Sequence, residues 1–168
     1  APLFDNLPEP KQTETVKPME QFDQGWGSIL YRTTLKEDIS GTLHIDEVHD
    51  WAQIFADGKL LGRLDRRRGE FTLHLQSPLK KGTQLDILVE AMGRVNFDKS
   101  IHDRKGISNK VEVVTGDKTT ELKDWMVYNL PPFYEFVSNK NYKSGNAVDG
   151  PAYYRAKFNL DKTGDTFL

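Results

Sequence analysis

The best candidate for a functional site is one charged stretch, residues 93–106, which gathers Arg, Asn, Asp and His side chains. Its residue types are those that bind sugar hydroxyls, because guanidinium and amide groups donate hydrogen bonds and carboxylates accept them. The same side chains can instead bond the loop backbone and hold the loop in one shape, and we favour that interpretation. The candidates for sugar binding or for contact with another domain are Arg94, Asn96, Asp98, His102, Asp103 and Arg104.

Three tryptophans, Trp26, Trp51 and Trp125, offer flat aromatic faces on which a sugar ring can stack. Each stands beside the start of an expected strand, where tryptophan more often anchors a core. We therefore favour the core interpretation for all three. Trp26 is kept among the candidates for sugar binding or interdomain contact.

The basic run Arg66, Arg67 and Arg68 has the composition of a phosphate-binding turn. Asp65 and Glu70 flank the run and dilute its positive field. We expect these arginines to form a solvated turn or to contact a neighbouring domain.

A metal site is not expected, although His44 and His49 lie close to several carboxylates. In an extended chain, two histidines five positions apart do not converge on one ion. The sequence has no cysteine, which excludes disulfides, thiolate zinc sites and a cysteine nucleophile. We expect no metal and no cofactor.

No catalytic residue is predicted in this chain. The phosphate-binding, dinucleotide-binding, zinc-protease, calcium-loop and serine-hydrolase motifs are all missing from the sequence. Glycoside hydrolysis needs two carboxyl groups at a set separation, and nothing selects such a pair among the 25 acidic residues.

The overall charge narrows the classes of partner. The 168 residues include 23 Lys and Arg against 25 Asp and Glu, a formal net charge of -2. A nucleic-acid-binding protein would show a basic footprint, and a membrane-surface protein a polybasic segment. No apolar run approaches the roughly 18 residues that span a bilayer. We therefore expect neither nucleic acid nor a membrane as a partner.

The elements that must position these residues are strands. Residues around 29–35, 71–75 and 85–91 follow a period of two, which predicts strands with one buried face. Asp57-Gly58 supplies the backbone angles of a hairpin turn between two of the expected strands. Many strands without long helices predict an all-β sandwich or jelly roll. Further strands are expected over 42–48, 51–57, 59–65, 110–114, 124–129 and 153–159.

The chain divides into three parts. Prolines make residues 1–20 an extended linker, and 21–150 form the sandwich. Residues 31–35 are echoed at 154–158, which suggests that 151–168 open a second, truncated sandwich. Such a tail cannot form a domain alone, so we expect it to pair with an edge of the first sandwich or to form a dimer through 151–168.

Several ordered segments resemble the β-domains of β-galactosidases of glycoside hydrolase family 35. The most recognisable is LDILVEAMGRVNF, residues 85–97. The others are QGWGSILYRTTL at 24–35, VHDWAQIFADG at 48–58, IHDRKGI at 101–107, LKDW at 122–125 and PAYYRAKF at 151–158.

This resemblance implies a galactose-binding-domain-like jelly roll that carries no hydrolase activity of its own. The family enzymes hydrolyse terminal β-galactosides with two glutamates of a TIM barrel, and no residue here matches those glutamates. The implied partners are that barrel and a second β-domain, against which this domain would act as a buttress. The alternative is a carbohydrate-binding module for galactosides. The resemblance also implies an exported parent enzyme, periplasmic or extracellular.

Overall fold

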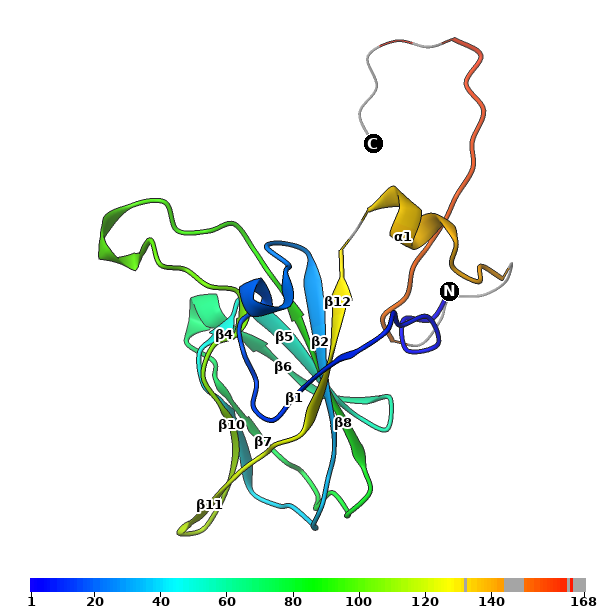
Figure 1. The fold of residues 1–168 in the computed structure, drawn as a ribbon. Coiled ribbons are helices and arrows are strands. Elements are labelled where there is room, and N and C mark those ends of the chain that lie inside the picture. The colour runs from blue at the N-terminus through cyan, green and yellow to red at the C-terminus, as the bar shows by residue number, and fades with distance from the viewer. Residues whose placement is uncertain (132, 144–149, 163, 165–168) are drawn as a thin grey trace.

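The computed structural model (Figure 1) describes residues 1–131, 133–143, 150–162 and 164. Within these residues the chain forms two antiparallel sheets that face each other, which confirms the predicted all-β sandwich. The larger sheet has the strand order β1 (Lys11–Thr13), β12 (Trp125–Leu130), β2 (Ser28–Thr34), β8 (Gln84–Glu90), β5 (Trp51–Ala56) and β6 (Lys59–Asp65). The smaller has the order β11 (Lys118–Glu121), β10 (Val111–Thr115), β3 (Thr42–Ile45) and β7 (Thr72–His74).

Short elements complete the fold at the ends of the sandwich. A two-stranded ribbon joins β4 (Val48–His49) to β9 (Gly106–Ile107). Three 3-10 turns are η1 (Met19–Phe22), η2 (Arg66–Arg68) and η3 (Asp98–Ser100). One short helix, α1 (Tyr134–Ser138), follows β12. No helix in the described residues is long and apolar enough to cross a membrane.

The main core lies between the two sheets, where the alternation predicted from sequence places it. Ile29 and Tyr31 of β2 face Leu43 of β3 and Val113 of β10, all nearly inaccessible to solvent. The predicted hairpin at Asp57-Gly58 joins β5 to β6, with positive φ at both residues as its turn type requires.

The outer face of the large sheet carries a second apolar cluster. Leu30, Phe55 and Leu88 are buried there under Leu3 and Phe4 of the amino-terminal segment. This segment, expected to be an extended linker, therefore packs on the sandwich, and its strand β1 pairs with β12. The domain boundaries at 20/21 and 150/151 stay predictions.

The amino terminus meets residues 151–153 on this outer face. The amide of Leu3 donates to the carbonyl of Pro151, and Ala1 and Tyr153 exchange two hydrogen bonds. Beyond this contact, 153–159 do not form the predicted strand, because no other strand of the described chain pairs with them. The last part of the proposed second sandwich, residues 165–168, lies outside the described residues. A galactose-binding-domain-like subtype, a second sandwich and a dimer through 151–168 remain predictions.

Candidate functional site

The charged stretch singled out from the sequence forms an arm at one end of the sandwich. We use "the arm" for residues 93–104, which leave β8 and return to β9 (Figure 1). The arm carries η3 at its tip, and it emerges beside η1 and the start of β2. Its base is held by charged side chains from four separate parts of the chain.

Lys105 is the centre of this base, and it is fully buried. Its ammonium donates to Asp50 Oδ2 at 2.6 Å, to Asp103 Oδ2 at 2.8 Å and to the carbonyl of Gly93 at 3.1 Å. An ammonium has three protons, so these three contacts satisfy it completely. A buried charge of this kind is stable only when its partners are held in place around it.

Arg66 closes the cluster from the opposite side. One guanidinium nitrogen donates to Asp50 Oδ1 at 2.9 Å and to Asp103 Oδ1 at 2.7 Å. Backbone amides supply further bonds, from Met92 to Asp50 and from Val95 to Asp103. We call Asp50, Arg66, Asp103 and Lys105 the ion cluster.

These contacts keep both carboxyl groups ionised. Burial by itself raises the pKa of Asp103, but hydrogen bonds from Lys105, the Val95 amide and Arg66 outweigh it and bring that pKa to about 2. At Asp50 burial also raises the pKa, but hydrogen bonds from Lys105, Arg66 and the Met92 amide outweigh it, so the pKa lies below its usual value. A general acid of a glycosidase needs a raised pKa, so neither carboxyl group suits that role.

A second set of bonds ties the arm to η1. Arg94 donates to the carbonyls of Asp103 and Gly25, each at 2.6 Å, and pairs with Glu20 at 2.6 Å. Glu20 in turn accepts from the amide of Lys105 at 3.0 Å. Both ends of the arm are therefore fixed to the body of the domain.

Tyr31 anchors the strand that follows the arm. Its hydroxyl donates to the carbonyl of Lys17 at 2.8 Å and accepts from the amide of Ile107 at 3.2 Å. Burial raises the pKa of Tyr31, so the hydroxyl stays protonated and keeps both bonds. Gly106 lies against this hydroxyl with a φ of 86°, and an added Cβ would stand only 2.3 Å from the oxygen. Glycine is thus required here by both space and backbone conformation.

The tip of the arm contrasts with its base. Phe97 is 81% exposed and Ile101 is 54% exposed, although both are large apolar side chains. Asn96, Asp98 and His102 also lie exposed along the arm. A firmly held base therefore presents a mixed tip whose largest side chains are apolar.

The other predicted residues take different places. Trp26 is 51% exposed and meets Phe133 edge-on, with ring centroids 5.1 Å apart. Trp125 is buried, and its indole N–H donates to the carbonyl of Leu122. Trp51, on β5, is partly buried. Sugar binding and interdomain contact by the candidate residues stay predictions.

The basic run divides between two roles. Arg66 enters the ion cluster, whereas Arg67 and Arg68 lie exposed beside Asp65 and Glu70 respectively. Arg104 is exposed, and its backbone carbonyl lies 2.7 Å from Nδ1 of His49.

The histidines singled out for a metal are separated. His44 on β3 pairs with Glu112 at 3.8 Å, while His49 on β4 lies 3.4 Å from Asp103. In the described residues, no group of three or more His, Asp or Glu side chains is arranged to hold a metal ion.

Sequence reasoning missed Lys105, Asp50 and Glu20, which complete the base of the arm. Asp50 stands 55 positions from Lys105, so no local spacing links the two. The one available signal was the alternation of Asp103 and Lys105, which places the two side chains on the same side of an extended chain.

Comparison with protein families matches residues 17–131 to the family described as "Beta-galactosidase, first all-beta domain". The match covers the ion cluster, the arm, η1 and most of both sheets.

Curated relatives agree with that match. The chain is 36% identical to "Beta-galactosidase" of Xanthomonas manihotis over 168 residues, which is 100% of this chain and 27% of that protein. It is 32% identical to "Beta-galactosidase 1" of Dictyostelium discoideum over 99% of this chain and 28% of that protein. It is 37% identical to "Beta-galactosidase" of Homo sapiens over 66% of this chain and 16% of that protein. The chain thus spans about a quarter of the length of the first two relatives.

Proposed function

The chain belongs to the family of the first all-beta domain of beta-galactosidases, and from this premise we propose that it is a non-catalytic sandwich that buttresses the catalytic part of a larger glycosidase. The catalytic part would be a TIM barrel that hydrolyses terminal β-galactosides. A second β-domain and an exported location of the whole enzyme belong to the same proposal.

The observation that carries this proposal is the contrast between the base and the tip of the arm. Four buried or half-buried charged groups fix the base, yet Phe97 and Ile101 at the tip face solvent. Burying one such side chain contributes about 1.5–3 kcal/mol, so a partner that covers the tip would gain this free energy. An arm with a fixed base and exposed apolar side chains at its tip suits docking, because a fixed base reduces the conformational entropy lost when a partner covers the tip.

The partner is argued from length. The relatives that match the whole chain are almost four times longer, so most of such a polypeptide lies outside this sandwich. We place the catalytic part against the arm. Galactoside binding at Trp26 and Arg94 is the alternative function, and Trp26 supports it by being half exposed next to the arm's anchor at Gly25.

The test is a chimera in which this chain replaces the matching segment of the Xanthomonas manihotis relative. Charging the tip with Phe97→Asp and Ile101→Asp should speed heat inactivation of the chimera at least severalfold, because a charged tip cannot be buried without a large desolvation cost. The same changes should leave the unfolding free energy of the 168-residue chain within about 0.5 kcal/mol, since both side chains are exposed there.

Leu60→Asp is the control, because Leu60 is an exposed apolar residue on β6, away from the arm. If Leu60→Asp harms the chimera as much as the arm variant does, or if the arm variant has no effect, docking through the arm is wrong.

A further inference from the structure

A groove opens on one side of the sandwich, at the opposite end of β2 from the arm. Ser28, at the start of β2, pairs with Glu90 just before the arm, whereas Thr33 and Thr34 at its other end line the groove. The groove consists of two adjoining hollows of about 550 Å³ and about 540 Å³, which share Glu14, Lys36 and Asp124. Each hollow falls within the roughly 300–1,000 Å³ of small-molecule sites.

The floor of the groove is buried and fixed. Leu35, Ile39 and Leu122 supply apolar surface, and each is less than a tenth exposed. The Thr33 hydroxyl donates to the carbonyl of Lys123, which joins β2 to the segment between β11 and β12. Trp125 lies at the floor with its indole N–H already bonded, so it shapes the floor without offering a free ring face.

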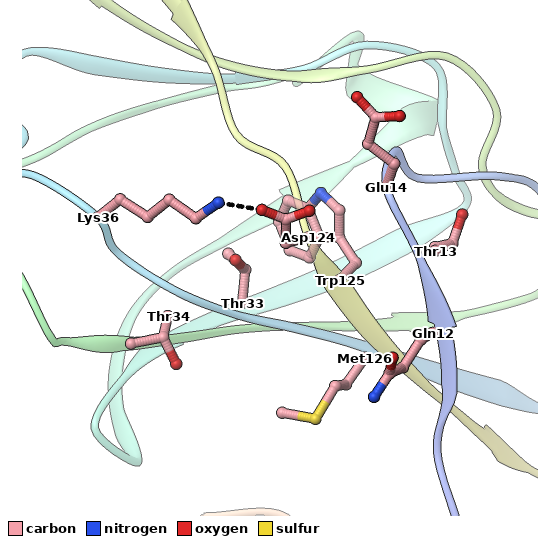
Figure 2. Close-up of a pocket in the computed structure, with 9 residues that line it drawn as sticks. All are labelled: Gln12, Thr13, Glu14, Thr33, Thr34, Lys36, Asp124, Trp125 and Met126. Atoms are coloured by element: carbon pink, nitrogen blue, oxygen red, sulfur yellow. Dashed lines mark hydrogen bonds and ion pairs between the residues drawn. The ribbon is translucent and has the colours of Figure 1, made fainter.

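The rim is polar, and its side chains come from β1, β2 and β11 and from the connections beside them. Figure 2 shows Lys36 reaching towards Asp124, with Glu14 beyond Asp124 and Gln12 beside Met126. Lys36 pairs with Asp124, and Lys123 pairs with Glu14 at 3.0 Å. Unlike the ion cluster, these pairs are exposed, so each partner keeps free hydrogen-bonding positions.

The backbone holds these rim groups at a set distance. Asp124 has a φ of 60°, in the left-handed region, and its amide donates to the carbonyl of Glu14 at 2.8 Å. This bond ties the end of β1 to the start of β12, so the carboxylates of Asp124 and Glu14 stand on adjoining segments of the rim.

The charges of the lining exclude one class of ligand. The two hollows are lined by more carboxylates than ammonium groups, so an anion would be repelled. The carboxylates are Glu14, Glu37, Glu121 and Asp124, and the ammonium groups are Lys36 and Lys123.

An uncharged ligand rich in hydroxyls can use both kinds of rim group, whereas a cation can use only the carboxylates. Each hydroxyl both donates and accepts, so it can donate to a carboxylate of the rim and accept from an ammonium while the two stay paired. The C–H face of a sugar ring would cover the apolar floor. We propose that this groove binds a neutral oligosaccharide through hydroxyl contacts to Lys36, Asp124 and Glu14. This site is independent of docking through the arm, because the two lie at opposite ends of β2.

The experiment titrates the 168-residue chain with lactose and with a β-galactan oligosaccharide, followed by amide chemical shifts. Saturable shifts are expected at Thr33, Thr34 and Asp124. Lys36→Met should weaken binding at least about tenfold, since it removes a hydrogen bond from a charged donor. Asp124→Asn should weaken it similarly while keeping a residue that tolerates left-handed backbone.

The matched control is Lys80→Met. Lys80 pairs with Asp38, and the two side chains are 75% and 55% exposed, the same fractions as for Lys36 and Asp124. Lys80→Met should leave sugar binding unchanged, and urea unfolding of each variant shows that it folds.

Three outcomes overturn the proposal. One is the absence of saturable shifts at millimolar sugar. Another is sugar binding that persists in Lys36→Met and is lost in Trp26→Ala, which moves the site to the arm. The third is that an oligolysine peptide binds the groove while neither sugar does, which would make it a site for a basic peptide.

Discussion

Lys105 and Lys36 each pair with an aspartate, but they do so in opposite surroundings. The side chains of Lys105 and Asp103 are both fully shielded from solvent, whereas those of Lys36 and Asp124 are 75% and 55% exposed. The first pair lies beneath the arm, and the second lies on the rim of the groove.

The difference shows that burial decides what an ion pair does. In a medium of low polarity, an unpaired charge is costly, so the buried partners are locked to one geometry. At the surface, water competes for both partners, and the pair contributes little to folding. The ion cluster therefore determines structure, and the groove pair leaves its atoms available to a ligand.

Removing the buried ammonium of Lys105 should have the largest effect on the unfolding free energy. Lys105→Met should cost about 3–5 kcal/mol of unfolding free energy, because Asp50 and Asp103 would face each other with Arg66 as the remaining cation of the ion cluster. Urea denaturation measures the loss.

A compensating variant tests the cause of that loss. Replacing Asp50 and Asp103 by asparagine together with Lys105→Met removes the stranded charges, so the triple variant should be more stable than Lys105→Met alone. If Lys105→Met costs less than about 1 kcal/mol, the ion cluster does not hold the base of the arm.

Acid should weaken the same cluster in a defined range of pH. The folded-state pKa of Asp103 is about 2, below the ordinary value of an unfolded aspartate, so its contribution is complete above about pH 4. It is lost as the pH falls from about 4 towards 2. The stability advantage of the native chain over Asp103→Asn should shrink by about 2 kcal/mol across this interval.

Urea unfolding of both proteins between pH 2 and 6 follows this advantage. Repeating the series in 1 M NaCl is the control, because salt screens exposed charges far more than buried ones. Parallel curves for the two proteins would show that Asp103 titrates normally and would contradict the structure of the cluster.

The sequence predicted the main core and the central hairpin because both depend on local patterns. Ile29 and Tyr31 recur at a period of two, and Asp57-Gly58 has few turn types open to it. It did not predict that Leu30, on the opposite face of the same strand, is fully buried. That burial comes from the amino-terminal segment, whose prolines are typical of a linker and whose three-residue strand is too short to show a period.

For the site, residue types were visible in the sequence and their partners were not. Arg94 and Asp103 stood out because the arm concentrates polar side chains, but their bonds to Gly25 and Arg66 cross 69 and 37 positions. A lysine in a charged loop is ordinarily solvated, so nothing marked Lys105 as buried. The groove was not predicted either, because strands distant in sequence form its rim.

The smallest expected effect is the change in unfolding free energy when the exposed pair of Lys36 and Asp124 is broken, which is the counterpart of removing the buried Lys105. Lys36→Met should change the unfolding free energy by less than about 0.5 kcal/mol, because both partners are exposed. Lys36 is the better partner to change, since replacing Asp124 by a residue intolerant of its left-handed φ would add about 1–2 kcal/mol of backbone strain. Urea denaturation in 20 mM NaCl should show this small difference, and in 1 M NaCl the difference should shrink towards zero, because salt screens an exposed pair. A loss of unfolding free energy above about 1 kcal/mol would mean that this exposed pair also stabilises the fold. Burial would then not separate the role of Lys105 from that of Lys36.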